Sequence, residues 1–93
     1  MIIKTEKEVS KALYEKIAAM DDVEACYRFF QDLCSITELR AMEQRYDVAK
    51  LLYEGNVYTD IVEKTGASSA TISRVNRALK YGENGLLEAL EQK

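Results

Sequence analysis

The chain has 93 residues with no proline and no tryptophan, and 47% of its residues are hydrophobic and 31% charged. This composition excludes a disordered or β-rich chain and favours one compact all-helical domain over residues 1–93, whose modest core a second copy would enlarge. The formal net charge of -3 excludes a uniformly basic nucleic-acid-binding protein, so any cationic surface is confined to part of the chain.

The N-terminal third predicts two helices. Thr5 followed by Glu8 has the form of a capping box, and apolar residues at helical spacing then predict a helix to about Met20. Asp21 and Asp22 can cap a second helix, in which apolar side chains leave little of the circumference polar. These side chains are Val23, Cys26, Tyr27, Phe29, Phe30, Leu33 and Cys34. Such a helix needs burial on several sides, which predicts a homodimer.

The rest of the chain predicts four more helices. Ser35 and Glu38 repeat the capping-box pattern at the start of the longest one, residues 36–54, which Gly55 ends. One apolar stripe follows this helix: Leu39, Met42, Tyr46, Ala49, Leu52 and Tyr53. Glycines 55, 66, 82 and 85 then separate three shorter helices, expected at Tyr58–Thr65, Ser69–Tyr81 and Leu86–Gln92. The fold class is therefore all-α, with six helices.

Residues 58–82 have the internal spacing of a helix-turn-helix. Gly66 can adopt the positive φ that ends a helix abruptly, and Ser68 can cap the next helix by accepting a backbone hydrogen bond. Four apolar residues are expected to pack the two helices at a fixed crossing angle: Ile61, Val62, Ile72 and Val75. These signals agree with one another, which favours a DNA-binding helix-turn-helix over a plain helical hairpin with a solvated, mildly basic face.

The second helix of this motif carries the candidate DNA-binding residues. They are Ser68, Ser69, Ala70, Ser73, Arg74, Arg77 and Lys80. Small side chains at its N-terminus can approach base edges or thymine methyls in the major groove, and the three cations can contact phosphate. Residues 1–57 hold eight Lys/Arg against eleven Asp/Glu, whereas residues 58–82 hold four against two. The charge reverses where DNA binding is predicted. The alternative is a protein-interaction module that uses the same hairpin without DNA.

Two stretches also resemble a known family. The recognition helix of the tryptophan repressor resembles the stretch Ala70-Thr-Ile-Ser-Arg-Val-Asn-Arg-Ala-Leu-Lys80, which Gly66-Ala67 precedes. Residues 38–55 resemble the helix before the helix-turn-helix of that repressor. The similarity covers about residues 35–90 and is greatest to the YerC/YecD branch of the Trp repressor superfamily. It implies an intertwined six-helix homodimer, with dimerisation helices in residues 1–57, the helix-turn-helix in 58–82 and a C-terminal dimer helix in 83–93.

The resemblance also implies roles for single residues. Ser69, Ala70 and Ser73 match positions that contact DNA, and Arg45, Thr71 and Arg74 match positions that hold the tryptophan corepressor. Where the repressor has a glycine after the matching arginine, this chain has Val75, whose branched side chain should fill the indole slot. We therefore expect no tryptophan corepressor and no other cofactor.

Two interpretations of Arg45 and Arg74 are open. In the first, the two arginines flank a planar or anionic effector. In the second, which we favour, both contact phosphate or form surface ion pairs of little energetic weight. Taken together, the sequence predicts a sequence-specific transcriptional regulator, a repressor that binds a palindromic operator as a homodimer.

Several other functions are disfavoured. The chain has no histidine, and no acid, base and nucleophile converge, so neither an enzyme nor a metal site is predicted. No leader peptide and no apolar run of about 18 residues is present, which indicates a cytoplasmic chain that does not cross a membrane. Cys26 and Cys34 lie roughly 12 Å apart along one expected helix, beyond disulfide reach, and are expected to be reduced core residues. Tyr14, Tyr27, Tyr46, Tyr53, Tyr58 and Tyr81 are expected to serve core and interface packing rather than base stacking.

Overall fold

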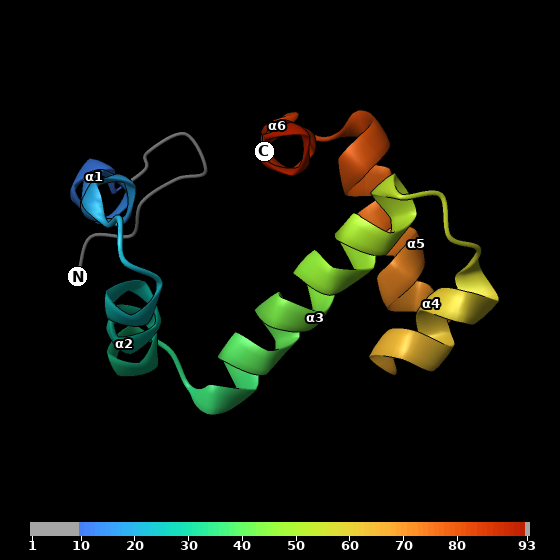
Figure 1. Ribbon diagram of the computed structural model, residues 1–93, viewed down its shortest axis with the longest axis horizontal. Helices are drawn as coiled ribbons and strands as arrows, with labels where there is room; N and C mark the ends of the chain where they lie inside the picture. Colours follow the sequence, from blue (N-terminus) through green and yellow to red (C-terminus); the bar gives the residue numbers. More distant parts are fainter. Residues whose placement is uncertain (1–9, 93) are drawn as a thin grey trace, which may run out of the picture. The chain divides into compact units, whose positions relative to one another are not determined.

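A computed structural model describes residues 10–92, which form six α-helices and no strand, as the all-α prediction requires (Figure 1). The helices are α1 (Lys11–Ala19), α2 (Val23–Leu33), α3 (Ile36–Tyr53), α4 (Tyr58–Thr65), α5 (Ser69–Tyr81) and α6 (Gly85–Glu91). They belong to two compact units, Met1–Ser35 and Ile36–Lys93. Within residues 10–92, no helix combines the length and the apolar character that crossing a membrane requires.

In the first unit, Asp22 caps α2. Its carboxylate oxygens accept hydrogen bonds from the backbone N–H groups of Glu24 and Ala25, both at 3.3 Å. Capping by this acidic pair is confirmed, with Asp22 as the residue that makes the bonds. The other predicted cap, Thr5 with Glu8, lies outside the described residues.

The two cysteines do not share one helix. α2 ends at Leu33, so Cys34 is the residue that follows the helix, and the prediction of a common helix was wrong by one position. The chain leaves the helical path at Cys34, whose backbone is extended, with φ -119° and ψ 156°. Both thiols are free and half-buried.

The apolar side chains of the first unit are poorly covered within one chain. Phe29 and Phe30 make an edge-to-face contact, with ring centroids 5.6 Å apart and ring planes at 84°. No residue of α1 or α2, residues 11–19 and 23–33, is fully buried. Val23 is 87% exposed, Tyr14 59% and Leu33 55%. Water therefore contacts an apolar surface that a small domain would be expected to bury.

In the second unit, α4, α5 and α6 pack against α3 (Figure 1). The core joins α3, α4, the turn after α4 and α5 through six buried residues: Val48, Ala49, Ile61, Ala67, Ile72 and Val75. Leucines surround them, namely Leu51 and Leu52 of α3, Leu79 of α5, and Leu86 and Leu90 of α6. Because the α3 members of this core all come from residues 48–52, the later helices are held by the C-terminal half of α3.

This arrangement corrects two sequence predictions about the core. Of the stripe expected on α3, Met42, Tyr46 and Tyr53 are exposed, whereas Val48, outside that stripe, is fully buried. Leu39 of the stripe is buried as expected, at 4% exposure. The shorter helices of this unit pack mainly on residues 48–52 of the 18-residue α3, which leaves Met42, Tyr46 and Tyr53 uncovered. Val62 was also expected in the core but is 42% exposed, and Ala67 packs there instead.

The ends of two helices differ slightly from expectation. α3 ends at Tyr53, one residue earlier than predicted, and α6 runs from Gly85 to Glu91 rather than from Leu86 to Gln92. Gly85 is therefore the first residue of α6 and not a separator. The turn before it falls on Asn84, which has a φ of 68°. Asparagine tolerates this left-handed conformation better than most residues with a side chain.

Candidate nucleic-acid interface

The turn between α4 and α5 is built around Gly66. Gly66 has φ 72° and ψ 6°, the left-handed conformation that ends α4, and its N–H donates to the carbonyl oxygen of Val62 at 2.8 Å. A Cβ at this position would meet no atom within 4 Å, so the glycine is required by backbone conformation and not by space. The predicted role of Gly66 is confirmed.

Thr65 and Gln44 brace this turn. The hydroxyl of Thr65 donates to the carbonyl oxygen of Ile61 at 2.7 Å and accepts from the N–H of Ala67 at 3.1 Å. From α3, the side-chain amide of Gln44 donates to the carbonyl oxygen of Thr65 at 3.1 Å. Nothing in the sequence indicates this role of Gln44, because its partner is a backbone atom 21 residues away.

Ser68 begins α5 as predicted. It has an extended backbone, with φ -71° and ψ 158°, and its side-chain oxygen accepts a hydrogen bond from the N–H of Thr71 at 3.1 Å. The same hydroxyl donates to the Thr71 hydroxyl at 3.1 Å. One free N–H of the first turn is thereby satisfied, and the remaining amides point out of the helix end.

One face of α5 is buried and the opposite face is exposed. Ile72 and Val75 are buried, and Leu79, a further turn along, is half-buried. Successive residues of an α-helix are rotated by about 100°, which places the candidate DNA-binding residues of α5 in one sector on the other side. They are Ser69, Ala70, Ser73, Arg74, Arg77 and Lys80, and all of them are exposed, as is Ser68. The structure thus brings every predicted DNA-binding residue to one open surface.

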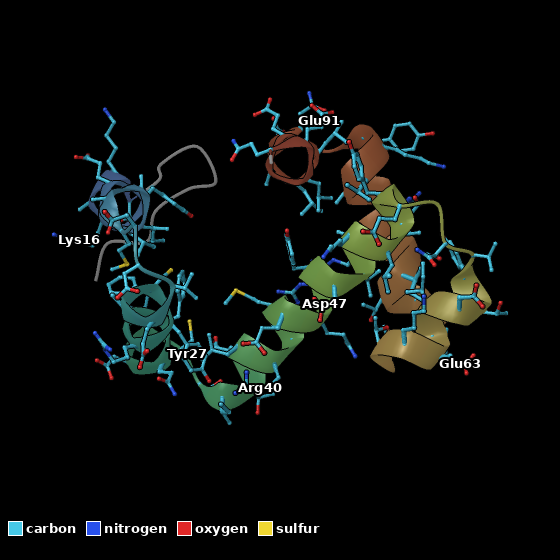
Figure 2. All side chains as sticks on the ribbon, viewed as in Figure 1. Lys16, Tyr27, Arg40, Asp47, Glu63 and Glu91 are labelled. Atoms are coloured by element: carbon cyan, nitrogen blue, oxygen red, sulfur yellow. The ribbon has the colours of Figure 1, made fainter. Side chains whose placement is uncertain are left out.

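This surface, which we call the α5 outer face, carries positive charge and no carboxylate. The acidic residues of the second unit all lie outside α5; three of them, Asp47 on α3, Glu63 on α4 and Glu91 on α6, are labelled in Figure 2. Arg74, Arg77 and Lys80 therefore have no carboxylate on their own helix. An anionic polymer with regularly spaced charges matches such a face.

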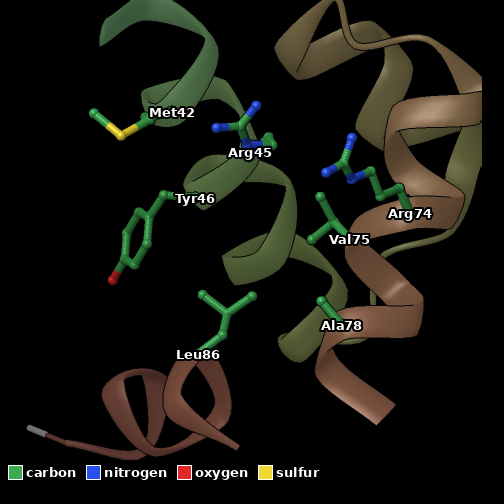
Figure 3. A pocket seen from close by; sticks show the side chains of 7 residues that line it. All are labelled: Met42, Arg45, Tyr46, Arg74, Val75, Ala78 and Leu86. Carbon is green, nitrogen blue, oxygen red and sulfur yellow. The ribbon is translucent and has the colours of Figure 1, made fainter. Parts of the chain in front are cut away.

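A hollow of about 370 Å³ adjoins the α5 outer face, between α3, α5 and α6. It is lined by Met42, Arg45, Tyr46, Arg74, Val75, Ala78 and Leu86 (Figure 3). Arg45 and Arg74 lie at one end, Leu86 lies at the other, and Val75 projects between them. The two arginines that were matched to an effector site are thus neighbours in space, whereas Thr71 does not line the hollow.

Val75 is anchored in the core rather than free at the edge of this hollow. Its side chain is 4% exposed and packs in the cluster that contains Val48 and Ile72. The branched side chain therefore occupies the space between α3 and α5.

Neither arginine of the hollow forms an ion pair within the part of the chain that the structure describes. Ion pairs in that part join other residues, such as Arg28 with Glu24 at 3.7 Å and Arg40 with Glu43. Because Arg45 and Arg74 have no carboxylate partner among residues 10–92, the ion-pair interpretation loses support. An anion outside this chain remains the natural partner for both side chains.

The fold and this surface define a class of protein. Two helices joined by a glycine turn, the second one capped by serine and open along a cationic face, form a helix-turn-helix, the arrangement of many DNA-binding proteins.

Comparisons with known proteins identify the family. The family described as Trp repressor protein matches residues 8–93. The chain is 50% identical over 80 residues to the uncharacterised protein YerC of Bacillus subtilis, covering 86% of this chain and 77% of that protein. The chain belongs to the Trp repressor family and to its YerC-like branch, and this family consists of DNA-binding regulators and not of enzymes.

Solved structures agree with this assignment. A TrpR-like protein from Eubacterium eligens has a TM-score of 0.83 and 48% identity, with 87% of this chain and 84% of that chain covered. A provisionally assigned Trp repressor from Staphylococcus aureus has a TM-score of 0.82 and 40% identity, with 86% and 80% covered. The predicted Trp repressor-like fold is confirmed.

Proposed function

We propose that this protein is a transcriptional repressor that binds a palindromic operator as a homodimer and thereby excludes RNA polymerase. The observation that carries this proposal is the α5 outer face, on which small side chains at the helix N-terminus stand beside three cations. Ser69, Ala70 and Ser73 are short enough to let the helix approach base edges. Arg74, Arg77 and Lys80 supply the phosphate contacts that dominate affinity.

The homodimer is supported by the first unit. Its apolar side chains stay in contact with water in one chain, and Val23 and Leu33 are among the most exposed apolar residues of the described part. Burying such residues stabilises a protein by about 1.5–3 kcal/mol each, so a second copy that covers them gains considerable free energy. A two-fold dimer places two copies of α5 about 34 Å apart, one DNA turn, which is why the operator should be palindromic.

The proposed repressor does not use tryptophan as corepressor. In the tryptophan repressor, which this chain resembles, a glycine leaves a slot for the indole ring at the position of Val75. Here Val75 is 4% exposed and packed in the core, so its branched side chain occupies the space that a glycine would leave to an indole. Arg45 and Arg74 then remain available for phosphate, which fits their lack of carboxylate partners within residues 10–92.

Selection of binding sites from random double-stranded DNA tests the proposal. The expected result is one palindromic consensus, whose half-sites are separated by about one helical turn and bound by two chains. Raising salt from about 50 to 200 mM should weaken binding by orders of magnitude, because several phosphate contacts are lost. Failure to enrich any sequence, or affinity that does not respond to salt, would refute the proposal.

A further inference from the structure

A side-chain hydrogen bond links α3 to the turn of the helix-turn-helix. Gln44 of α3 donates from Nε2 to the carbonyl oxygen of Thr65, at 3.1 Å, and both groups are part-buried. Thr65 is the last residue of α4, and the last carbonyls of a helix have no partner within the helix. The Gln44 amide therefore satisfies a backbone group that α4 leaves open.

The bond from Gln44 acts on a turn that has little internal freedom. The hydroxyl of Thr65 is bonded both to the preceding turn of α4 and to the N–H of Ala67, and the N–H of Gly66 is bonded to Val62. Ala67 is also 2% exposed in the core. Ser68, the N-cap residue of α5, follows directly. Where Thr65 lies relative to α3 therefore fixes where α5 begins, because Ser68 is only three residues further along the chain.

The core alone does not define this position sharply. Apolar contacts such as those among Val48, Ile61 and Ile72 are non-directional, and they tolerate small rotations of one helix on another. A hydrogen bond, in contrast, weakens steeply when its length or angle changes. Gln44 therefore adds a directional restraint to a contact that is otherwise mainly apolar.

We infer that Gln44 is a positioning residue, which sets the orientation of α5 on α3 and so the accuracy with which α5 meets base edges. This inference rests on the proposed DNA-binding function. Contacts to base edges require aligned donors and acceptors, whereas contacts to phosphate tolerate displacement. Loss of the bond should therefore reduce discrimination between sequences more than it reduces binding to DNA in general.

Two variants remove the bond in different ways. Gln44→Met keeps the length of the side chain and removes the donor, whereas Gln44→Asn keeps the amide and shortens the reach by one methylene. Gln92→Met, at an exposed position after α6, is the matched control. Two quantities are measured in the full chain, well below the unfolding temperature of every variant. They are amide hydrogen exchange at Gly66 and Ala67, and affinity for the selected operator and for a random duplex.

Both variants should speed amide exchange in the turn by about tenfold, because the turn opens more easily, and should leave exchange in α1 and α2 unchanged. Affinity for the operator should fall about three- to tenfold, as expected for one hydrogen bond, with affinity for the random duplex within about twofold of wild type. The control should match wild type in both measurements.

Unchanged exchange in the turn would overturn the inference. So would faster exchange with an unaltered ratio of operator to random affinity, because the bond would then support the fold without orienting α5. A wild-type chain that binds neither duplex would refute the proposed function instead, and exchange would still decide whether Gln44 holds the turn.

Discussion

The side-chain oxygen of Ser68 lies 3.1 Å from the backbone nitrogen of Thr71 and accepts its hydrogen bond, so one residue both starts α5 and stands exposed on the surface proposed to meet DNA. Stability and binding are therefore coupled at Ser68. Substitutions can separate the two, because the cap needs an acceptor and DNA repels a negative charge.

Ser68→Ala should lower the free energy of unfolding by about 1 kcal/mol, because the N–H of Thr71 loses its acceptor. Ser68→Asp should keep the stability, since a carboxylate caps well and interacts favourably with the helix dipole, but it should weaken DNA binding by repelling phosphate. Urea unfolding and a DNA-binding titration measure the two effects. Ser73→Ala, exposed in mid-helix, is the control, and an equal loss of stability there would contradict the capping role.

Gly66→Ala should destabilise the protein by about 1–2 kcal/mol, because an L-residue is forced into left-handed backbone conformation. No steric contribution is expected, since nothing lies within 4 Å of the added Cβ. Gly85→Ala is a matched control: its Cβ also meets open space, and its φ is not left-handed. Thermal unfolding of the three proteins checks this. A similar change in midpoint for both variants would argue against strain at Gly66.

Val75→Ala should lower the free energy of unfolding by about 1–3 kcal/mol, because it leaves a cavity between α3 and α5. Calorimetric titration of the wild-type protein with tryptophan should give no binding. Val75→Gly should gain affinity for tryptophan if Val75 closes the slot. Circular dichroism first has to show that this variant is folded. Micromolar binding by wild type would disprove the absence of a tryptophan corepressor.

Charge reversal on the α5 outer face should abolish DNA binding and leave the dimer intact. Arg77→Glu and Arg74→Glu each remove one phosphate contact and add repulsion, whereas replacing the same arginines by glutamine should reduce the salt slope by about one for each contact. Lys16→Glu on α1 provides a control of equal charge change. Fluorescence anisotropy with labelled DNA and sedimentation of the free protein give the two readouts. Retained DNA binding by both reversed variants would locate the interface elsewhere.

The proposed dimer makes a prediction at Leu33. This side chain is 55% exposed, so Leu33→Glu would hardly change the stability of the protein if one chain were the functional unit. If a second copy covers α2, the buried charge should instead shift the protein to monomer, because desolvating an unpaired carboxylate is costly. Val62→Glu, at a 42% exposed position on α4, is the control and should stay dimeric. Sedimentation equilibrium distinguishes these outcomes, and a Leu33→Glu dimer as tight as wild type would contradict the proposed interface.

The sequence by itself determined the local features of the candidate site. Gly66 at a positive φ, the Ser68 cap and the bounds of α4 and α5 all agree with prediction. Each depends on residues within about four positions, where backbone sterics and capping act. The exposure of Ser69, Ser73 and Arg77 was predictable too, because helical periodicity relates them to the buried Ile72 and Val75.

Only the tertiary structure decided which apolar residues meet a partner and how the helix-turn-helix is held. Met42 and Val62 fit an apolar stripe but stay exposed, while Val48 and Ala67 are buried, because burial depends on where the neighbouring helices lie along α3. The bond from Gln44 to Thr65 joins groups 21 residues apart and uses a backbone acceptor, which leaves no trace in the sequence. Such contacts exist because the packed core brings distant segments together, and local rules do not reach that far.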